Sequence, residues 1–192
     1  MRRKSFDTLI SFTGLLIAIV LLVAGGLLAW ASVFIGNQVH DQLAAQKIFF
    51  PAAGSAAVKG SEFAAMRQYG GKQLTTGAQA ETYANHFIAV HLSEVAAGKT
   101  YAEVSTALQA DPTNTTLQAQ ADTLFKGNTL RGLLLNAYAF GTMSSLAMIA
   151  AIVSFVAAAL LLLLSLLGFR HSHRFPAESD VSGSQKPAAA RV

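Results

Sequence analysis

Two histidines and two glutamates lie close together in the middle of the chain, at Glu81, His86, His91 and Glu94. His91 and Glu94 are three residues apart, a spacing that makes them neighbours on a helix surface. With His40 they would form a site of two histidines and one carboxylate, as in non-haem iron enzymes. His86 and His91, however, are five residues apart, about 140° around a helix, so they cannot easily hold one ion. The alternative for His91 is a place in the packed face of its helix.

The preceding loop has the sequence QYGGKQLTTGAQ, with a double glycine and a lysine. A P-loop requires Gly-x-x-x-x-Gly-Lys followed by Ser or Thr, between a strand and a helix. Here Gln73 follows the Gly71-Lys72 pair, and Met66 stands where the first glycine is required. No serine lies in a Gly-x-Ser-x-Gly elbow either. We therefore predict a flexible loop that leads into a helix, and assign no catalytic, cofactor-binding or metal-binding residue.

The elements around these residues are dominated by two uncharged stretches. No charged residue lies between Asp7 and His40, and none lies between Arg131 and Arg170. Each stretch exceeds the roughly 20 apolar residues that span a bilayer. Charged residues make up only 12% of the chain, about half the usual fraction of a soluble domain. The predicted fold class is all-α, with two transmembrane helices flanking a small helical extracytoplasmic domain.

Basic residues at the two ends indicate the orientation. The chain starts MRRKSF, and GFRHSHRF follows the second stretch. Lys and Arg favour the cytoplasmic side, so both termini should be cytoplasmic and the protein should lie in the plasma membrane. Aromatic residues at the outer ends are typical of an interfacial belt: Trp30, Phe34, Tyr138 and Phe140. The predicted boundaries are 1–7 for the cytoplasmic N-terminus, 8–35 for the first transmembrane helix, 36–131 for the extracytoplasmic domain, 132–168 for the second transmembrane helix with an outer extension, and 169–192 for a disordered cytoplasmic tail.

The first apolar stretch has an alternative reading as a cleaved signal peptide. Ala29-Trp30-Ala31 resembles a cleavage site, but the apolar run is longer than a usual signal core. Small residues at helical spacing instead predict that the two helices pair, since they let backbones approach closely in lipid. They are Gly14, Ala18, Gly25 and Ala29 in the first helix and Ala147, Ala151, Ser154 and Ala158 in the second. We expect an antiparallel hairpin.

The segment between the stretches contains repeated helix signals. Thr76 and Gln79 fit a capping box, which predicts a long helix to about Ala97. Thr100 and Glu103 fit a second capping box, which opens a shorter helix. The apolar face of the long helix, at helical spacing, consists of Ala84, Phe87, Ile88, His91, Leu92 and Val95.

Other helix boundaries follow from proline, glycine and asparagine. The first apolar helix should continue outward as far as Pro51. Ser61–Tyr69 should form a short helix. Pro112 indicates the start of another helix, Gly127 its end, and Asn128 the cap of the second membrane helix. No alternating strand pattern of useful length is present.

The chain has no cysteine, which excludes disulfides and zinc-thiolate sites. The segment from residue 36 to residue 131 has seven Lys/Arg and seven Asp/Glu residues, so its charges balance and we predict no nucleic-acid partner. The expected partners are the lipid bilayer and a membrane protein of unknown identity, and the chain is a possible homo-oligomer. Aromatic residues in this segment form either a small core or a ligand pocket: Phe49, Phe50, Phe63, Tyr69, Tyr83, Phe87 and Phe125.

Three segments carry a resemblance to a known family: QLAAQKIFFP, MRQYGGKQLTTGAQAETYANHFIAVHL and TLFKGNTLRGLLLNAYAFG. They resemble a family of two-span membrane proteins from actinobacteria, over about residues 6 to 170. Some members carry the description of an aromatic ring-opening dioxygenase subunit, which implies a soluble iron-dependent enzyme. This sequence departs from that description in having two membrane spans and no recognisable set of iron ligands. The resemblance carries over no functional residue.

Three functions follow as hypotheses. The first is a non-enzymatic accessory or sensor-like envelope protein without a cofactor. The second is a metal-dependent aromatic ring-opening dioxygenase that binds iron through His86 or His91. The third is a membrane protein that binds a lipid or small molecule through the aromatic cluster.

Overall fold

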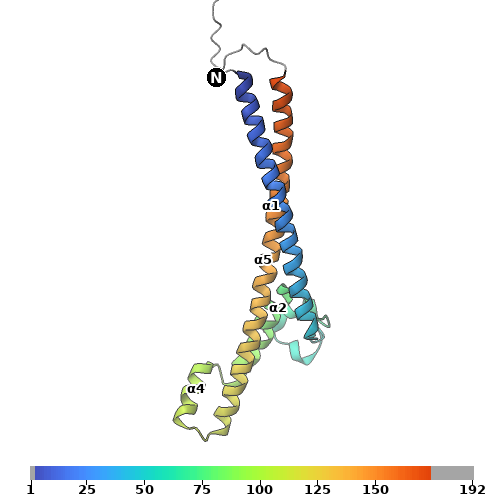
Figure 1. Cartoon of the computed structure of the whole chain (residues 1–192). Coiled ribbons are helices and arrows are strands. Elements are labelled where there is room, and N and C mark those ends of the chain that lie inside the picture. The colour runs from blue at the N-terminus through green and yellow to red at the C-terminus, as the bar shows by residue number, and fades with distance from the viewer. Residues whose placement is uncertain (1–2, 174–192) are drawn as a thin grey trace, which may run out of the picture. The chain divides into compact units, whose positions relative to one another are not determined.

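A computed structural model describes residues 3–173 of the chain. These residues form helices and loops without a strand, so the all-α fold class is confirmed. A single antiparallel bridge pairs Phe49 with Gln73. The elements in chain order (Figure 1) are α1 (Arg3–Ala45), the 3₁₀ helices η1 (Ala56–Val58) and η2 (Ser61–Tyr69), α2 (Gly77–Tyr83), the π-helical turn η3 (Ala84–Ile88), α3 (Ala89–Val95), α4 (Tyr101–Ala110) and α5 (Thr115–Ser172).

Helices α1 and α5 are each long and apolar enough to cross a membrane. Only 11% of the most apolar window of each helix is buried within the protein, whereas the core helix of a soluble protein would be mostly buried. Large apolar side chains such as Val20, Leu27 and Leu164 are more than half exposed. A surface of this kind is stable against lipid. The predicted disordered tail begins at residue 169, but α5 continues to Ser172, and residues 174–192 lie outside the described part of the chain.

The described part of the chain divides into two compact units, residues 3–31 with 147–173 and residues 32–146. In the first unit, small residues form the contact between the two long helices. Ala18, Ala151 and Ala158 are almost completely buried. A Cβ atom on Gly25 would lie 3.0 Å from the ring of Phe155, and one on Gly14 would lie 2.6 Å from the Ser165 hydroxyl. These contacts run antiparallel, as the small-residue pattern predicts.

The burial pattern in this unit has a longer repeat than the sequence analysis expected. The buried small residues recur every seven positions, at Ser11, Ala18 and Gly25 in α1 and at Ala151, Ala158, Ser165 and Ser172 in α5. A seven-residue repeat is the period of left-handed helix pairs. The contact therefore resembles a coiled coil with small residues in place of leucine.

The second unit, residues 32–146, has two hydrophobic clusters. The larger cluster joins α1, η1, η2, α2, η3 and α5 through Leu43, Phe50, Val58, Phe63, Met66, Leu74, Ala80, Ala84 and Leu134. The smaller cluster joins α3, α4 and α5 through Leu92, Ala96, Val104, Ala121 and Leu124. The predicted short helix Ser61–Tyr69 is confirmed as the 3₁₀ helix η2.

The predicted long helix is confirmed as the continuous run α2–η3–α3. Its capping box has both bonds: the Gln79 amide donates to the Thr76 hydroxyl (3.3 Å), and the Thr76 amide donates to the Gln79 side chain (3.0 Å). Gly98, with a φ of 82°, follows the end of the run. Residues 84–88 form a π-helical turn that the apolar pattern did not predict.

The predicted helix end at Gly127 and the cap at Asn128 are wrong, because α5 passes through both residues without a break. A Cβ atom on Gly127 would lie 2.4 Å from a Leu92 methyl carbon. Glycine therefore allows α3 to pack closely on α5, which offsets its usual helix cost of about 1 kcal/mol. The helix begins at Thr115 rather than at Pro112, and Asn114 caps it by accepting a hydrogen bond from the Leu117 amide (3.1 Å).

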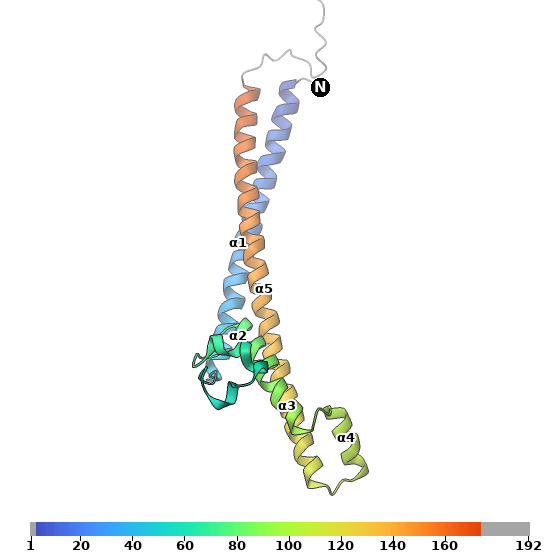
Figure 2. The ribbon, with the colours of Figure 1, turned by 180° about the vertical axis from the view of Figure 1, so that it is seen from behind.

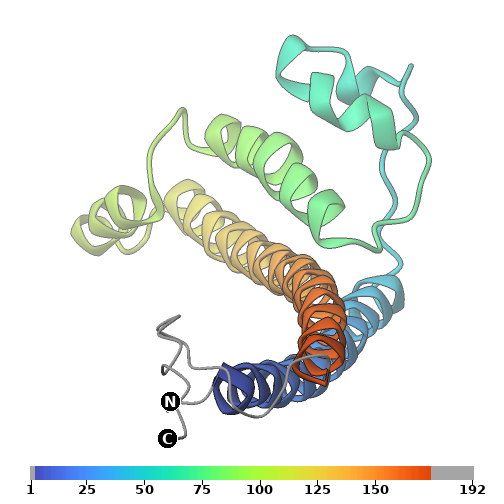
Figure 3. The ribbon, with the colours of Figure 1, turned by 90° about the horizontal axis from the view of Figure 1, so that it is seen from above.

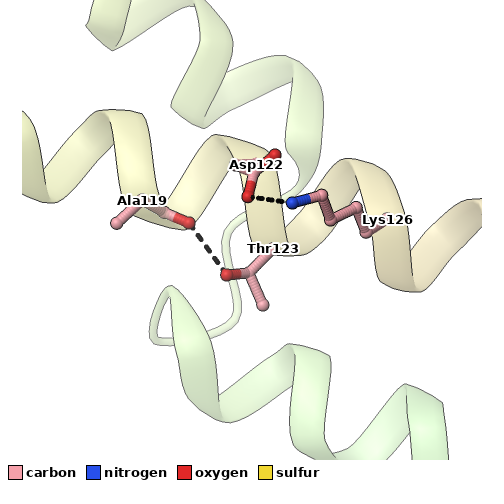
Figure 4. Close-up of polar contacts among 4 residues, drawn as sticks. All are labelled: Ala119, Asp122, Thr123 and Lys126. Carbon is pink, nitrogen blue, oxygen red and sulfur yellow. Dashed lines mark hydrogen bonds and ion pairs between the residues drawn. The ribbon is translucent and has the colours of Figure 1, made fainter.

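Local side-chain contacts support α5 where the sequence predicted its end. Figure 4 shows Lys126 bonded to Asp122 (2.7 Å), one turn earlier, and the Thr123 hydroxyl donating to the Ala119 carbonyl (2.9 Å). Both charged side chains are well exposed. Such pairs stabilise a helix by about 0.3–0.5 kcal/mol, so we assign them a structural role.

Helix α4 begins with the second predicted capping box, which is also confirmed. Hydrogen bonds from the Thr100 amide and hydroxyl hold the pKa of Glu103 below its ordinary value. Because the folded-state pKa is lowered, the carboxylate stabilises the helix above the unfolded-state pKa. That stabilisation is lost as pH falls through the folded-state pKa.

We therefore expect hydrogen exchange in residues 101–110, corrected for intrinsic rates, to accelerate as pH falls below the ordinary glutamate range. The Glu103→Gln variant keeps the cap geometry but does not titrate, so its corrected exchange should be independent of pH in that range. Equal pH dependence in the two proteins would contradict this role for Glu103.

Candidate functional site

An apolar groove of about 790 Å³ lies within residues 32–146. Three helical segments form it: α1, α5 and the α2–η3 part of the long helix. The run α2–η3–α3 lies beside α5 (Figures 2 and 3) and packs antiparallel to it, since Gly77 contacts Tyr138 and the Gln120 side chain donates to the Val95 carbonyl. The apolar walls of the groove include Phe34, Val39, Leu43, Tyr83, Phe87, Ile88, Leu130, Leu133, Leu134 and Phe140.

The polar groups in the groove are uncharged. Gln38 and Gln42 lie four residues apart on α1, Gln46 follows directly after the end of this helix, and Asn136 lies on α5. The amide of Gln42 donates to Gln38 over 3.5 Å, a long and weak bond. Burial raises the pKa of the Tyr83 phenol, which therefore stays neutral at physiological pH. The groove presents hydrogen-bonding groups without a formal charge.

The π-helical turn positions one wall of the groove. Here the Ala89 amide donates to the carbonyl of Ala84, five residues earlier, and such turns are frequent at functional sites. The turn contributes Phe87 and Ile88 to the groove. Asn85, in the same turn, accepts a hydrogen bond from Arg131 of α5 (2.8 Å) and donates one to Glu81 (2.8 Å). The Asn85 side chain thus bridges the Arg131 guanidinium and the Glu81 carboxylate, and its bond to Arg131 links the π turn to α5.

A chain of aromatic rings in tilted and edge-to-face contact continues from this wall. Phe50 contacts Tyr69 and Tyr83, with ring centres 5.2 and 5.4 Å apart, and Tyr83 contacts Phe87 at 4.8 Å. Phe50 is buried, whereas Phe49 is 57% exposed. The aromatic residues therefore serve both roles that the sequence left open, since some form the core and others line the groove.

The histidines do not converge on one point. The His86 Nδ1 atom lies 3.2 Å from the Glu62 carbonyl oxygen, and the His91 Nδ1 atom lies 2.8 Å from the Phe87 carbonyl oxygen. The prediction that His91 lies in the packed face of the helix is wrong, because its side chain is exposed. Its ring still contacts those of Phe63 and Phe87, with centres 5.8 and 4.3 Å apart. His40 lines a separate cleft of about 440 Å³. Within residues 3–173, no three His, Cys, Asp or Glu side chains are close enough to hold a metal ion.

The glycine-rich loop is held by the backbone. The Gly71 amide donates to the Phe50 carbonyl, the Phe50 amide to the Lys72 carbonyl, and the Leu74 amide to the Ile48 carbonyl, over 2.9–3.1 Å. A phosphate cradle needs free amides that point at the ligand, and the Gly71 amide is already used. This loop positions Ile48 and Phe50 at the groove and its core.

Comparison with protein-family models, with curated proteins and with solved structures finds no match. Fold and groove together define the class of protein: an all-helical chain with two helices able to cross a membrane and a neutral apolar groove in residues 32–146. This groove was not predicted from the sequence. A signal was present in Gln38, Gln42 and Gln46, which recur at helical spacing beside an apolar face along the end of α1 and just after it.

Proposed function

We propose that the chain is a non-enzymatic membrane protein that binds an apolar molecule in the groove, as an accessory or sensor-like component of the cell envelope. The groove is the observation that supports this function most directly. Its volume falls in the range of about 300–1,000 Å³ typical of small-molecule sites, and its few polar groups among apolar walls are also typical. The dioxygenase alternative gains no support from the arrangement of His86 and His91.

We further propose that the protein lies in the plasma membrane with both termini cytoplasmic and residues 36–131 extracytoplasmic. Basic residues next to both uncharged stretches support this orientation. In this position the groove would lie outside the cytoplasm. When the groove is occupied, a membrane-protein partner or a second copy of the chain would respond to the bound ligand.

The orientation predicts how single cysteines react, and the natural chain offers a clean background because it has no cysteine. We expect Gln109→Cys, on exposed α4, to react in intact cells with a membrane-impermeant maleimide. Ser5→Cys, at the exposed start of α1, should react only after the cells are opened. The opposite pattern, read as a mass shift on the purified chain, would reverse the proposed topology.

The function itself is tested by purifying the full chain from its native membrane in mild detergent, with lipid mass spectrometry and metal analysis on the same sample. We expect an apolar molecule in about stoichiometric amount, together with a membrane partner. Stoichiometric iron, without bound lipid or partner, would overturn the proposal in favour of the dioxygenase.

A further inference from the structure

We infer that the groove takes a lipid with a single apolar tail and an uncharged, hydrogen-bonding head group. This inference rests on the proposed function, since it names the ligand class of the same groove. Three properties of the groove lead to it: its charge, its dimensions along α1 and its place on the two long helices.

The charge of the lining excludes ionic head groups. None of the residues that line the groove is Lys, Arg, His, Asp or Glu, and Tyr83 stays a neutral phenol. An ionised head group buried here would have no counter-charge, and burying an unpaired charge is strongly unfavourable. The amides of Gln38, Gln42 and Gln46 instead offer both donors and acceptors. A hydroxyl, ester or amide head group matches them.

The length of the groove matches one lipid chain. Its lining extends along α1 from Phe34 to Leu43 and reaches Gln46 directly after the helix; the span from Phe34 to the end of α1 at Ala45 is about 16 Å at 1.5 Å per residue. One leaflet of a bilayer core is about 15 Å thick, so a single tail of membrane length fits along the helix.

The groove also lies where membrane lipid would reach it. The uncharged stretch of α5 runs from residue 132 to residue 169, about 57 Å of helix, whereas a bilayer core is about 30 Å thick. Part of this apolar surface must therefore lie beyond the hydrocarbon core. Leu133 and Phe140, both more than half exposed, belong to this stretch and line the groove. A lipid tail that covers them would shield apolar surface from water.

The test uses the full chain in phosphatidylcholine vesicles with photoreactive probes that share one tail: a monoacylglycerol, an alkyl sulfate and a two-chain phosphatidylcholine. Cross-linked peptides are mapped by mass spectrometry. We expect the monoacylglycerol to label the groove peptides at least about tenfold more than the alkyl sulfate, the ratio that 1.4 kcal/mol gives. The two-chain probe should label them as weakly as the alkyl sulfate does.

Two variants make the test specific. Leu133→Trp fills the groove and should lower monoacylglycerol labelling about tenfold. Leu146→Trp, at an equally exposed site of α5 outside the groove, should leave it unchanged. Replacing Gln38, Gln42 and Gln46 by leucine should remove the preference for the monoacylglycerol over a tagged alkane. Melting curves of the variants confirm that each is folded.

The outcomes separate this inference from the proposed function. Equal or stronger labelling by the charged or two-chain probe would overturn the ligand class and leave a ligand-binding groove. Groove labelling that is unaffected by Leu133→Trp would also overturn the inference, because the probe would then lie elsewhere. Absence of groove labelling by every probe would overturn both, and a partner protein cross-linked at the groove in native membranes would replace the lipid as its occupant.

Discussion

Replacing Phe50 with alanine is expected to lower the free energy of unfolding of residues 32–146 by about 3–5 kcal/mol, the usual cost of a phenylalanine in a core. The Phe50 side chain is 3% exposed. Its ring touches Tyr69 and Tyr83 and belongs to the larger hydrophobic cluster. Removing it leaves a cavity under the groove wall, so both the transfer free energy and the packing contacts are lost.

The neighbouring residue provides a matched control. Phe49 is the same residue type, one position earlier, but it is 57% exposed. Its pairing with Gln73 is a backbone bridge that alanine retains. We expect Phe49→Ala to change the free energy of unfolding by less than about 0.5 kcal/mol, as for most surface substitutions. Thermal unfolding followed by circular dichroism compares the two variants, and equal losses would show that the Phe50 cluster is not the core.

Features that depend on nearby residues were predictable from the sequence. Both capping boxes need only residues three positions apart, and both are present with their two bonds. The run α2–η3–α3 follows from its apolar spacing. The first helix was expected to continue as far as Pro51, but α1 ends six residues earlier, at Ala45. The two long apolar helices follow from uncharged length alone. In each case the determining interactions are local.

Apart from the pairing of the two long helices, features that depend on distant residues were not predictable. Gly127 continues a helix because it packs on Leu92, 35 positions earlier in the chain, whereas glycine taken locally predicts a helix end. The π turn is tied to α5 by the bond between Arg131 and Asn85. The groove exists only where three helical segments meet. Each residue type was visible in the sequence, but no spacing rule relates residues so far apart.

Gly77 is the second position at which a substitution should strongly lower stability, because the backbones of α2 and α5 approach each other closely there. A Cβ atom at Gly77 would lie 3.0 Å from the Ala137 carbonyl oxygen, 3.1 Å from the Tyr138 Cα and 3.2 Å from the Gly141 Cα. These are backbone atoms of α5, which cannot rotate away as a side chain can. Larger residues must therefore push the start of α2 away from α5, and overpacking of this kind costs about 1–3 kcal/mol.

Gly77→Leu should accordingly destabilise residues 32–146 by about 3 kcal/mol, at the upper end of that range because the opposing atoms are backbone. Leucine has a higher helix propensity, worth up to about 1 kcal/mol, so the steric cost must exceed this gain before any loss is measured. Gly132→Leu is the matched control, because a Cβ atom there meets nothing within 4 Å. In that variant only the higher helix propensity of leucine changes the free energy of unfolding, so stability should stay equal or rise. Thermal unfolding and hydrogen exchange of residues 77–83 distinguish the two. If Gly77→Leu proves as stable as Gly132→Leu, then α2 does not pack backbone to backbone on α5, and the groove that depends on this packing would have a different wall.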